Sequence, residues 1–140
     1  MAGFLFNQGA YQLQSAGISW TGATIKGRLV PTAQGVADID ADVMTGIGST
    51  EASASVTLGS CVGPTLDDAE DNVKYSSANA VFTAAALAIG ACNRMVIYKF
   101  ITNDGASIPI ACLDITAVTP NGGDVTVTCP ALGWFFTQQA

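Results

Sequence analysis

A chain of 140 residues suits a single domain, and a domain of this size buries enough surface to fold without disulfides or a structural metal. Only 11% of its residues are charged while 49% are hydrophobic, so we expect other subunits to cover part of its surface. The net charge of −6 argues against binding to nucleic acid or to an anionic membrane surface. We therefore expect one domain over residues 1–140 that belongs to a protein assembly.

The amino-terminal stretch has the spacing of a short amphipathic helix. In residues 4–16, Phe6 and Leu13 lie at helical intervals, Gly17 is placed to end the helix, and Gly9 weakens it. No cation precedes the apolar residues, so a secretory signal is not expected.

The next segment changes to the two-residue period of a strand. The stretch "TIKGRLV" (24–30) places apolar residues on one face and Lys26 and Arg28 on the other, which predicts a half-buried strand that Pro31 ends. Residues 31–50 show no strong period and are rich in Gly, Ala, Asp and Thr. We expect them to form a long loop or an extended arm that contacts a neighbour.

The rest of the chain reads as a series of short strands. The stretch 80–89 could be strand or helix, whereas 94–100 is apolar on both faces and suits a central strand that turns back at 103–105. The other strands are predicted at 53–58, 72–76, 110–115 and 124–129. Together these features predict a mainly β fold: an antiparallel β-sandwich or sheet with a short N-terminal helix and an extended arm or long loop.

The segment "PNGGD" (120–124) could be a phosphate-binding loop or a simple chain reversal. A phosphate loop would lead into a helix whose first N–H groups bind the anion. Here a strand follows, with Val125 and Val127 on one side and Thr126 and Thr128 on the other. The sequence therefore predicts a turn.

The residue types give little support to catalysis. No histidine is present, which excludes Ser-His-Asp triads, Cys-His pairs and His-ligated zinc sites. We expect no catalytic residue and no cofactor, and the protein is not expected to be an enzyme.

Three aspartates in the predicted arm have the spacing that opens a calcium loop. Asp38, Asp40 and Asp42 fit it, but Val43 stands where the turn requires glycine and Ser49 where the bidentate glutamate belongs. In an extended segment the same spacing places three carboxylates on one face, toward solvent or a partner's cation. No metal site is expected.

Three further features have structural interpretations. The acidic run 66–72 is typical of a solvated loop, with weak cation binding as the alternative. The longest apolar-leaning stretch, 78–92, is shorter than the roughly 20 residues that cross a bilayer, so no membrane span is expected. The four cysteines never form a C-x-x-C pair, and buried free thiols are expected rather than two disulfides.

Aromatic residues gather near both ends of the chain. Adjacent residues 134–136 cannot all face one way in a strand, so at least one should pack against the N-terminal helix or another subunit. With the acidic arm, they complete the candidate partner interface: Phe4, Phe6, Tyr11, Trp20, Asp38, Asp40, Asp42, Trp134, Phe135 and Phe136.

The order of several motifs resembles a family of small virion proteins of tailed phages. After a short N-terminal helix, the chain carries "TIKGRLV" at 24–30, "VIYK" at 96–99, "LDI" at 113–115, "VTPNGGDVTV" at 118–127 and an aromatic close at 134–136. The resemblance spans most of the chain, and its most specific marker is the segment 118–127.

This resemblance implies a structural role in the virion. It points to a head decoration, or cement, protein that stabilises the head shell by binding the major capsid protein on the capsid exterior, after assembly in the host cytoplasm. A homo-oligomer is expected, and the three-fold sites of icosahedral shells favour a trimer. The alternatives are a tail or tail-fibre-associated virion component and, in another class, a cytoplasmic small-molecule-binding module.

Overall fold

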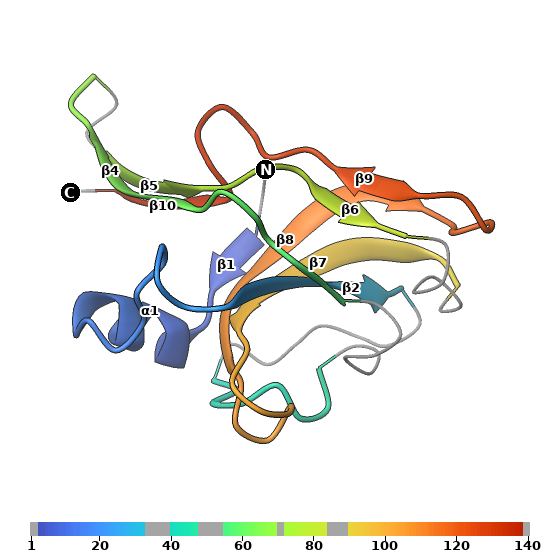
Figure 1. Cartoon of the computed structure of the whole chain (residues 1–140), viewed down its shortest axis with the longest axis horizontal. Helices are drawn as coiled ribbons and strands as arrows, with labels where there is room; N and C mark the ends of the chain where they lie inside the picture. Colours follow the sequence, from blue (N-terminus) through green and yellow to red (C-terminus); the bar gives the residue numbers. More distant parts are fainter. Residues whose placement is uncertain (1–2, 33–39, 48–54, 70–71, 84–89, 139–140) are drawn as a thin grey trace.

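The computed structural model describes residues 3–32, 40–47, 55–69, 72–83 and 90–138 (Figure 1). Within these ranges the chain folds into antiparallel sheets with one short helix near the N-terminus, which confirms the predicted fold class. The elements are β1 (Gly3–Leu5), α1 (Asn7–Gln14), β2 (Ile25–Pro31), β3 (Ser55–Thr57), β4 (Val62–Asp67), β5 (Asn72–Ser76), β6 (Ala80–Phe82), β7 (Cys92–Lys99), β8 (Ile108–Val118), β9 (Val125–Val127) and β10 (Phe135–Gln138).

The largest sheet has five strands in the order β1-β8-β7-β2-β3, and all neighbouring pairs are antiparallel. β7 lies at the centre, as its apolar residues on both faces predicted. β7 leads into β8 through the loop 100–107, which contains the predicted turn at 103–105.

Two smaller sheets, β10-β5-β4 and β6-β9, lie over one face of the large sheet (Figure 1). β6 follows β5 along the chain, and their antiparallel partners β9 and β10 are also consecutive, so the small sheets continue one another. The main core fills the space between the layers, and its buried members include Trp20, Leu29, Phe82, Met95, Ile97 and Trp134.

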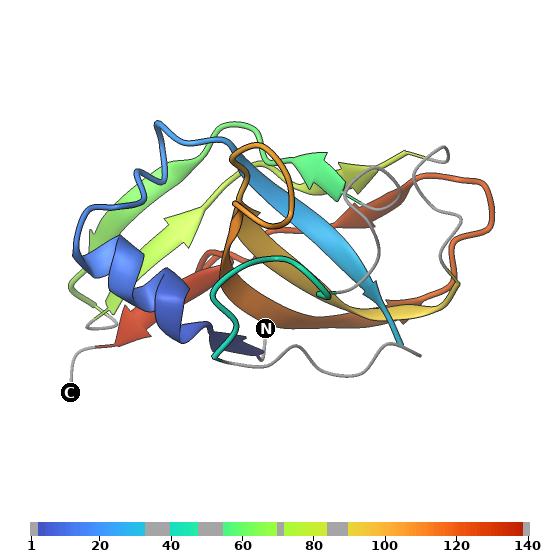
Figure 2. The same ribbon diagram turned by 90° about the horizontal axis from the view of Figure 1, so that it is seen from below.

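The opposite face of the large sheet is covered by loops (Figure 2). Residues 40–47 (teal) and the loop 100–107 (orange) lie in front of the sheet in this view. The Met44 N–H donates to the carbonyls of Asp104 (3.0 Å) and Ser107 (3.1 Å), which joins the two segments. We call the two sides the strand-covered face and the loop-covered face, and the buried cluster of the latter contains Phe6, Val30, Met44, Ile47, Val96, Tyr98 and Cys112.

β2 differs from the half-buried strand predicted for it. Pro31 is its last residue, as expected, but Arg28 is fully buried because the loop-covered face is closed. Residues 40–47 of the predicted arm pack on the chain's own sheet, while 33–39 and 48–50 lie outside the described residues. Contact of the arm with a neighbour stays a prediction.

The amino-terminal helix is shorter than predicted. Its expected beginning forms β1, which pairs with β8, and α1 covers only residues 7–14. Gly9 is buried against β8, where an added Cβ would lie 2.5 Å from the Ile110 Cα. Gly9 therefore permits the close approach of helix and strand, which outweighs its weak helix propensity.

The helix also ends earlier than predicted, at Gln14 instead of Ala16. Ala16, and not Gly17, adopts the left-handed conformation with a φ of 59°. The Gly17 N–H donates to the Gln12 carbonyl at 2.8 Å, as in a Schellman motif. Gly17 therefore follows the left-handed residue instead of occupying it.

The segment 120–124 is confirmed as a turn between two strands. It joins β8 to β9, and the Asn121 side-chain oxygen accepts the Gly123 N–H at 3.2 Å. Val125 and Val127 are buried while Thr126 is exposed, as the alternation predicted. β9 pairs with β6 and not with β8, so the turn does not close a hydrogen-bonded hairpin.

Three parts of the chain form strands that the sequence patterns missed or left open. The predicted acidic loop at 66–72 begins within β4 and ends at the start of β5, and Asp68 and Ala69 form a turn after β4. Within the ambiguous stretch 80–89, β6 is a strand, and residues 84–89 lie outside the described residues. The aromatic close contributes β10, which pairs with β5.

Candidate functional site

Four aromatic residues predicted for a partner interface are core residues of the chain itself. Phe6, Trp20, Trp134 and Phe135 are each at most 7% exposed. The Trp20 and Phe135 rings meet edge-on with centroids 5.4 Å apart, and the Trp20 Nε1–H donates to the Ser76 carbonyl at 2.9 Å. These side chains pack within the chain, which corrects the interface prediction for all four.

The other candidates include exposed residues near the N-terminus and in the arm. Tyr11 is 63% exposed on α1, whereas Phe4 is half-buried and meets the Phe6 ring edge-on. Asp40 and Asp42 are exposed, and Asp40 accepts a hydrogen bond from the Asn7 side chain. Their contact with a partner stays a prediction.

For the two remaining candidates the structure describes no side-chain position. Asp38 lies outside the described residues. Phe136 contributes its backbone to β10, opposite Lys74 of β5. Both keep the status of predictions.

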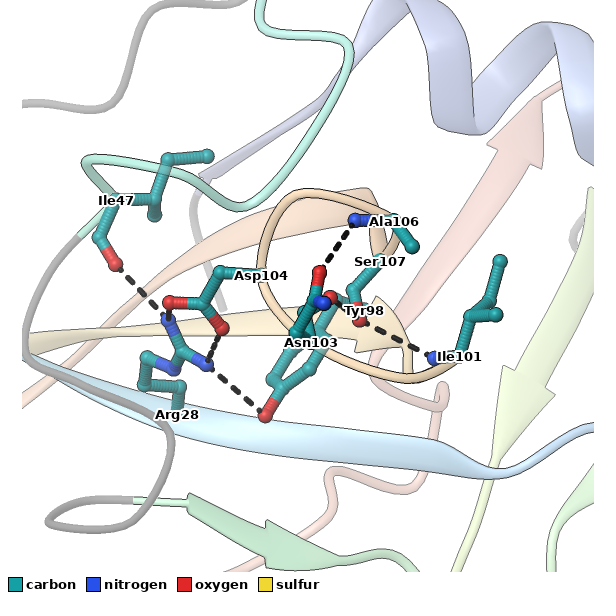
Figure 3. A network of polar contacts seen from close by, with 8 residues as sticks. All are labelled: Arg28, Ile47, Tyr98, Ile101, Asn103, Asp104, Ala106 and Ser107. Atoms are coloured by element: carbon teal, nitrogen blue, oxygen red, sulfur yellow. Dashed lines mark hydrogen bonds and ion pairs between the residues drawn. The ribbon is translucent and has the colours of Figure 1, made fainter.

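A buried charged network fixes the loops of the loop-covered face (Figure 3). The Arg28 guanidinium makes a bidentate contact with the Asp104 carboxylate, at 2.7 Å and 3.1 Å. It also donates to the Tyr98 hydroxyl and to the Ile47 carbonyl, each at 3.3 Å. These contacts join β2, β7, the loop 100–107 and residues 40–47 at one point.

The loop 100–107 is internally hydrogen-bonded in a way that presents Asp104. The buried Ser107 hydroxyl donates to the Asn103 carbonyl at 2.8 Å, and the Asn103 side-chain oxygen accepts the Ala106 N–H at 3.2 Å (Figure 3). These bonds reduce the conformational freedom that the carboxylate would lose on pairing.

The surroundings of Arg28 keep it charged. Burial alone lowers the pKa of Arg28, but the hydrogen bonds to Asp104 and Tyr98 and the charge of Asp104 outweigh burial, so the pKa is raised. Among the described residues no group accepts a hydrogen bond from Nε. A buried ion pair adds little net stability, so we interpret this network as a clamp that positions loops.

The cations of the chain are all engaged within it. Besides Arg28, Arg94 pairs with Asp114 at 3.1 Å and Lys74 with Asp67 at 3.2 Å. Of the two remaining cations, Lys99 donates to the Gly17 carbonyl at 3.2 Å, and the Lys26 Nζ lies 4.0 Å from the centroid of the Phe100 ring. With its cations engaged in this way and a net charge of −6, the chain suits neutral or basic partners better than anionic ones.

Metal sites and membrane-spanning helices were also sought among the described residues. They contain no group of three or more His, Cys, Asp or Glu side chains placed to hold a metal ion. Across the same ranges, no helix combines the length and the apolar character needed to cross a membrane.

The four cysteines have unpaired thiols. Cys92 and Cys112 are buried, while Cys61 and Cys129 are half-buried. Burial raises the pKa of each thiol, which lowers its reactivity at neutral pH.

The most exposed large apolar side chains lie at one end of the molecule. α1 and the β4-β5 hairpin share this end in Figure 1, and they carry Tyr11 (63% exposed), Val62 (56%) and Leu66 (64%). We call these three residues the helix-end surface. Because the β4-β5 pairing is irregular, Val62 lies opposite Ser76 and Leu66 opposite Val73, so β4 exposes apolar groups on both of its faces.

Sequence patterns missed two of these features. Arg28 alternates with apolar residues, so the pattern placed it on an exposed face. Its counter-charge, Asp104, was present in a strong turn signal but far away in the sequence. β4 was missed because Gly63 and Pro64 interrupt its pattern.

The described residues thus offer a buried clamp and an exposed apolar end. No protein-family model, no curated protein and no solved structure matches this chain.

Proposed function

We propose that the chain is a non-enzymatic structural protein of a phage virion. In this proposal it decorates the outside of the head shell, binds the major capsid protein and assembles as a homo-oligomer, expected to be a trimer. The helix-end surface carries the proposal, because it holds the most exposed large apolar side chains of the described residues, and exposed apolar groups beyond scattered single ones mark a protein contact. The sequence resemblance supplies the virion and the capsid partner.

The contact at this end is expected to be made by side chains. β4 is an edge strand, but Pro64 and the irregular pairing interrupt the row of backbone groups that another strand would need. Tyr11, Val62 and Leu66 would instead pack against complementary apolar groups of the partner, which would contact more than one face of this end. Repetition of a modest contact over many copies raises the overall binding strength through avidity.

The proposal is tested first by copy number. Purified, washed particles would be analysed by quantitative mass spectrometry, and the amount of this chain compared with that of the major capsid protein. A copy number comparable to that of the capsid protein is expected. A far lower number would favour a tail component, and absence from washed particles would reject a virion role.

The helix-end surface is tested by charge insertion. Val62→Lys and Leu66→Lys should each abolish sedimentation of the protein with heads that lack it, because an unpaired ammonium would be buried at the contact. Ile101→Lys and Leu132→Lys are matched controls, since both residues are apolar, 45% exposed and outside this surface. Equal losses in all four variants would contradict the assigned surface. In a separate experiment, light scattering of the isolated protein would test whether it is a trimer.

A further inference from the structure

The turn 119–124 joins two strand segments that run back along each other without pairing. β8 pairs with β1 only as far as Leu113, so its last residues, 114–118, have an unpaired edge on that side in the described part of the chain. β9 pairs with β6 on one side and, among the described strands, with none on the other. The two segments therefore form an open hairpin.

A groove of about 480 Å³ lies between the arms of this hairpin, lined by residues 115–118 and 124–128. A residue in a sheet occupies about 160 Å³, from its rise along the strand, the spacing between strands and the spacing between stacked sheets. The groove is therefore large enough for about three residues of an extended chain.

The groove lies at the open position in a ring of neighbouring strands. On the far side of the molecule, β3 of the large sheet contacts β6, which brings the two layers together there. The strands then follow in the order β8-β7-β2-β3-β6-β9, and the open position lies between β9 and β8. A strand added there would pair unpaired edges on both sides.

These two edges lack proline and lysine, two of the features that usually prevent strand addition, although the pairing of β8 with β7 is irregular between Asp114 and Val118. Proteins protect exposed edges with proline, lysine or bulges, and β4 carries both a proline and a pairing irregularity. The segments "DITAV" (114–118) and "DVTVT" (124–128) contain neither proline nor lysine and are rich in β-forming residues.

The lining indicates the chemistry of the occupant. Val125 and Val127 are buried, whereas Thr116 and Thr126 are exposed hydroxyl residues. Asp124 is exposed at the turn end of the groove, and no cation of the described residues forms an ion pair with it. A strand that carries a lysine or arginine near this end would complement the groove.

We propose that this groove binds an extended, lysine- or arginine-containing segment of a partner protein by strand addition. The segment runs antiparallel to one arm and parallel to the other, and its backbone N–H and C=O groups pair with 114–118 and 124–128. This inference depends on the proposed function in one respect: the partner is a protein of the same assembly.

The test uses the full chain and a set of acetylated, amidated heptapeptides that alternate valine and threonine, with one lysine moved through every position. Peptides would be titrated into ¹⁵N-labelled protein, with amide shifts and hydrogen exchange recorded. Shifts and slowed exchange confined to 114–118 and 124–128 are expected for at least one register. If no peptide perturbs these residues up to millimolar concentration, the proposal is overturned.

Two modified peptides test the binding mode. Replacement of the lysine by glutamate should weaken binding about fivefold or more, through repulsion by Asp124. Methylation of alternate backbone nitrogens, in both phases, should weaken it about tenfold or more, because the hydrogen bonds are lost. Unchanged binding of the methylated peptides would reject strand addition.

Protein variants locate the site. Ala117→Trp, which fills the groove, and Asp124→Lys should weaken peptide binding, whereas the exposed controls Ala69→Trp and Asp68→Lys in the β4-β5 turn should leave it unchanged. Protection of the same residues without peptide, rising with protein concentration, would assign the groove to a second copy and overturn the partner assignment. Peptide binding and virion copy number are independent, so either can fail alone.

Discussion

The two faces of the large sheet are both buried, but by different means. On the strand-covered face, the small sheets satisfy their own backbone groups and fill the core with aromatic and aliphatic side chains. On the loop-covered face, residues 40–47 and 100–107 have no strand partner, and Arg28 binds both. Loops lose more conformational freedom on folding and bury fewer apolar groups in return. The comparison teaches that a buried charge can position loops where apolar packing alone does not specify them.

A matched pair of phenylalanines measures this difference directly. Phe82 lies in the core of the strand-covered face and Phe6 in the cluster of the loop-covered face, and both are 0% exposed. We expect Phe82→Ala to lower the free energy of unfolding by about 4 kcal/mol and Phe6→Ala by less, because loops can collapse into a cavity more easily than paired strands. Chemical denaturation measures both changes, and equal losses would mean that the two faces are equally rigid.

The clamp itself gives the next largest effect. Asp104→Ala leaves Arg28 buried without a counter-charge and should cost about 3 kcal/mol. Arg28→Met removes the buried charge, and the Asp104 side chain is 30% exposed and can be hydrated, so a loss of about 1 kcal/mol is expected. The Arg28→Met/Asp104→Ala double variant should recover most of the loss of Asp104→Ala. If Arg28→Met proved the more damaging single change, the clamp interpretation would be wrong.

Gly9 tests the helix that adjoins both faces. Gly9→Ala would place a Cβ 2.5 Å from the Ile110 Cα, so α1 must shift away from β8, at a cost of about 2 kcal/mol. Gly59→Ala is the control, because its Cβ would meet no atom within 4 Å, and a change of less than about 0.5 kcal/mol is expected. Thermal unfolding of both variants would measure the contrast, which disappears if α1 docks loosely.

The reactivity of two buried thiols can show whether each face opens, and this measurement needs no substitution at the thiols themselves. Cys92 lies in the core of the strand-covered face and Cys112 in the cluster of the loop-covered face. In the unmodified protein, both should react slowly with iodoacetamide. In Asp104→Ala, Cys112 should react faster while Cys92 stays slow, as followed by peptide mass spectrometry. Parallel acceleration of both thiols would indicate global unfolding instead of loop release.

The smallest effect concerns pH. Burial raises the pKa of Cys92 and Cys112, so these thiols stay protonated in the folded chain when they ionise in the unfolded chain. Their contribution to stability is therefore complete below the ordinary thiol pKa of about 8.5 and is lost as pH rises above it. The double variant Cys92→Ala/Cys112→Ala should show a shallower decline of unfolding free energy between about pH 8 and pH 10. Identical slopes would contradict this linkage.

Sequence patterns predicted the strands with regular alternation and the turns with strong local signals. The central strand 94–100, the turn 103–105 and the turn 120–124 were predicted because a few neighbouring residues determine them. β1 could not be predicted in this way, because its residues are strand only through pairing with β8. Gly9 appeared unfavourable because its role depends on a distant backbone.

The candidate site was less predictable than the fold. Aromatic content identified residues of energetic importance, but it did not distinguish core from surface: Trp20 and Trp134 are buried, while Tyr11 is exposed. Arg28 and Asp104 are 76 residues apart in sequence, so their pairing follows only from the fold. The groove at 115–118 depends on where β1 stops, which no local pattern records.

The pairing of β1 with β8 also sets an order of events during synthesis. Residues 3–5 leave the ribosome well before their partners at 111–113, which follow about 5–20 seconds later at ordinary rates of translation. An eight-residue helix such as α1 is unstable alone, so the leading segment has no fixed structure until β8 is made. A chaperone on the nascent chain would therefore meet Phe4 and Phe6 uncovered until β8 has been made.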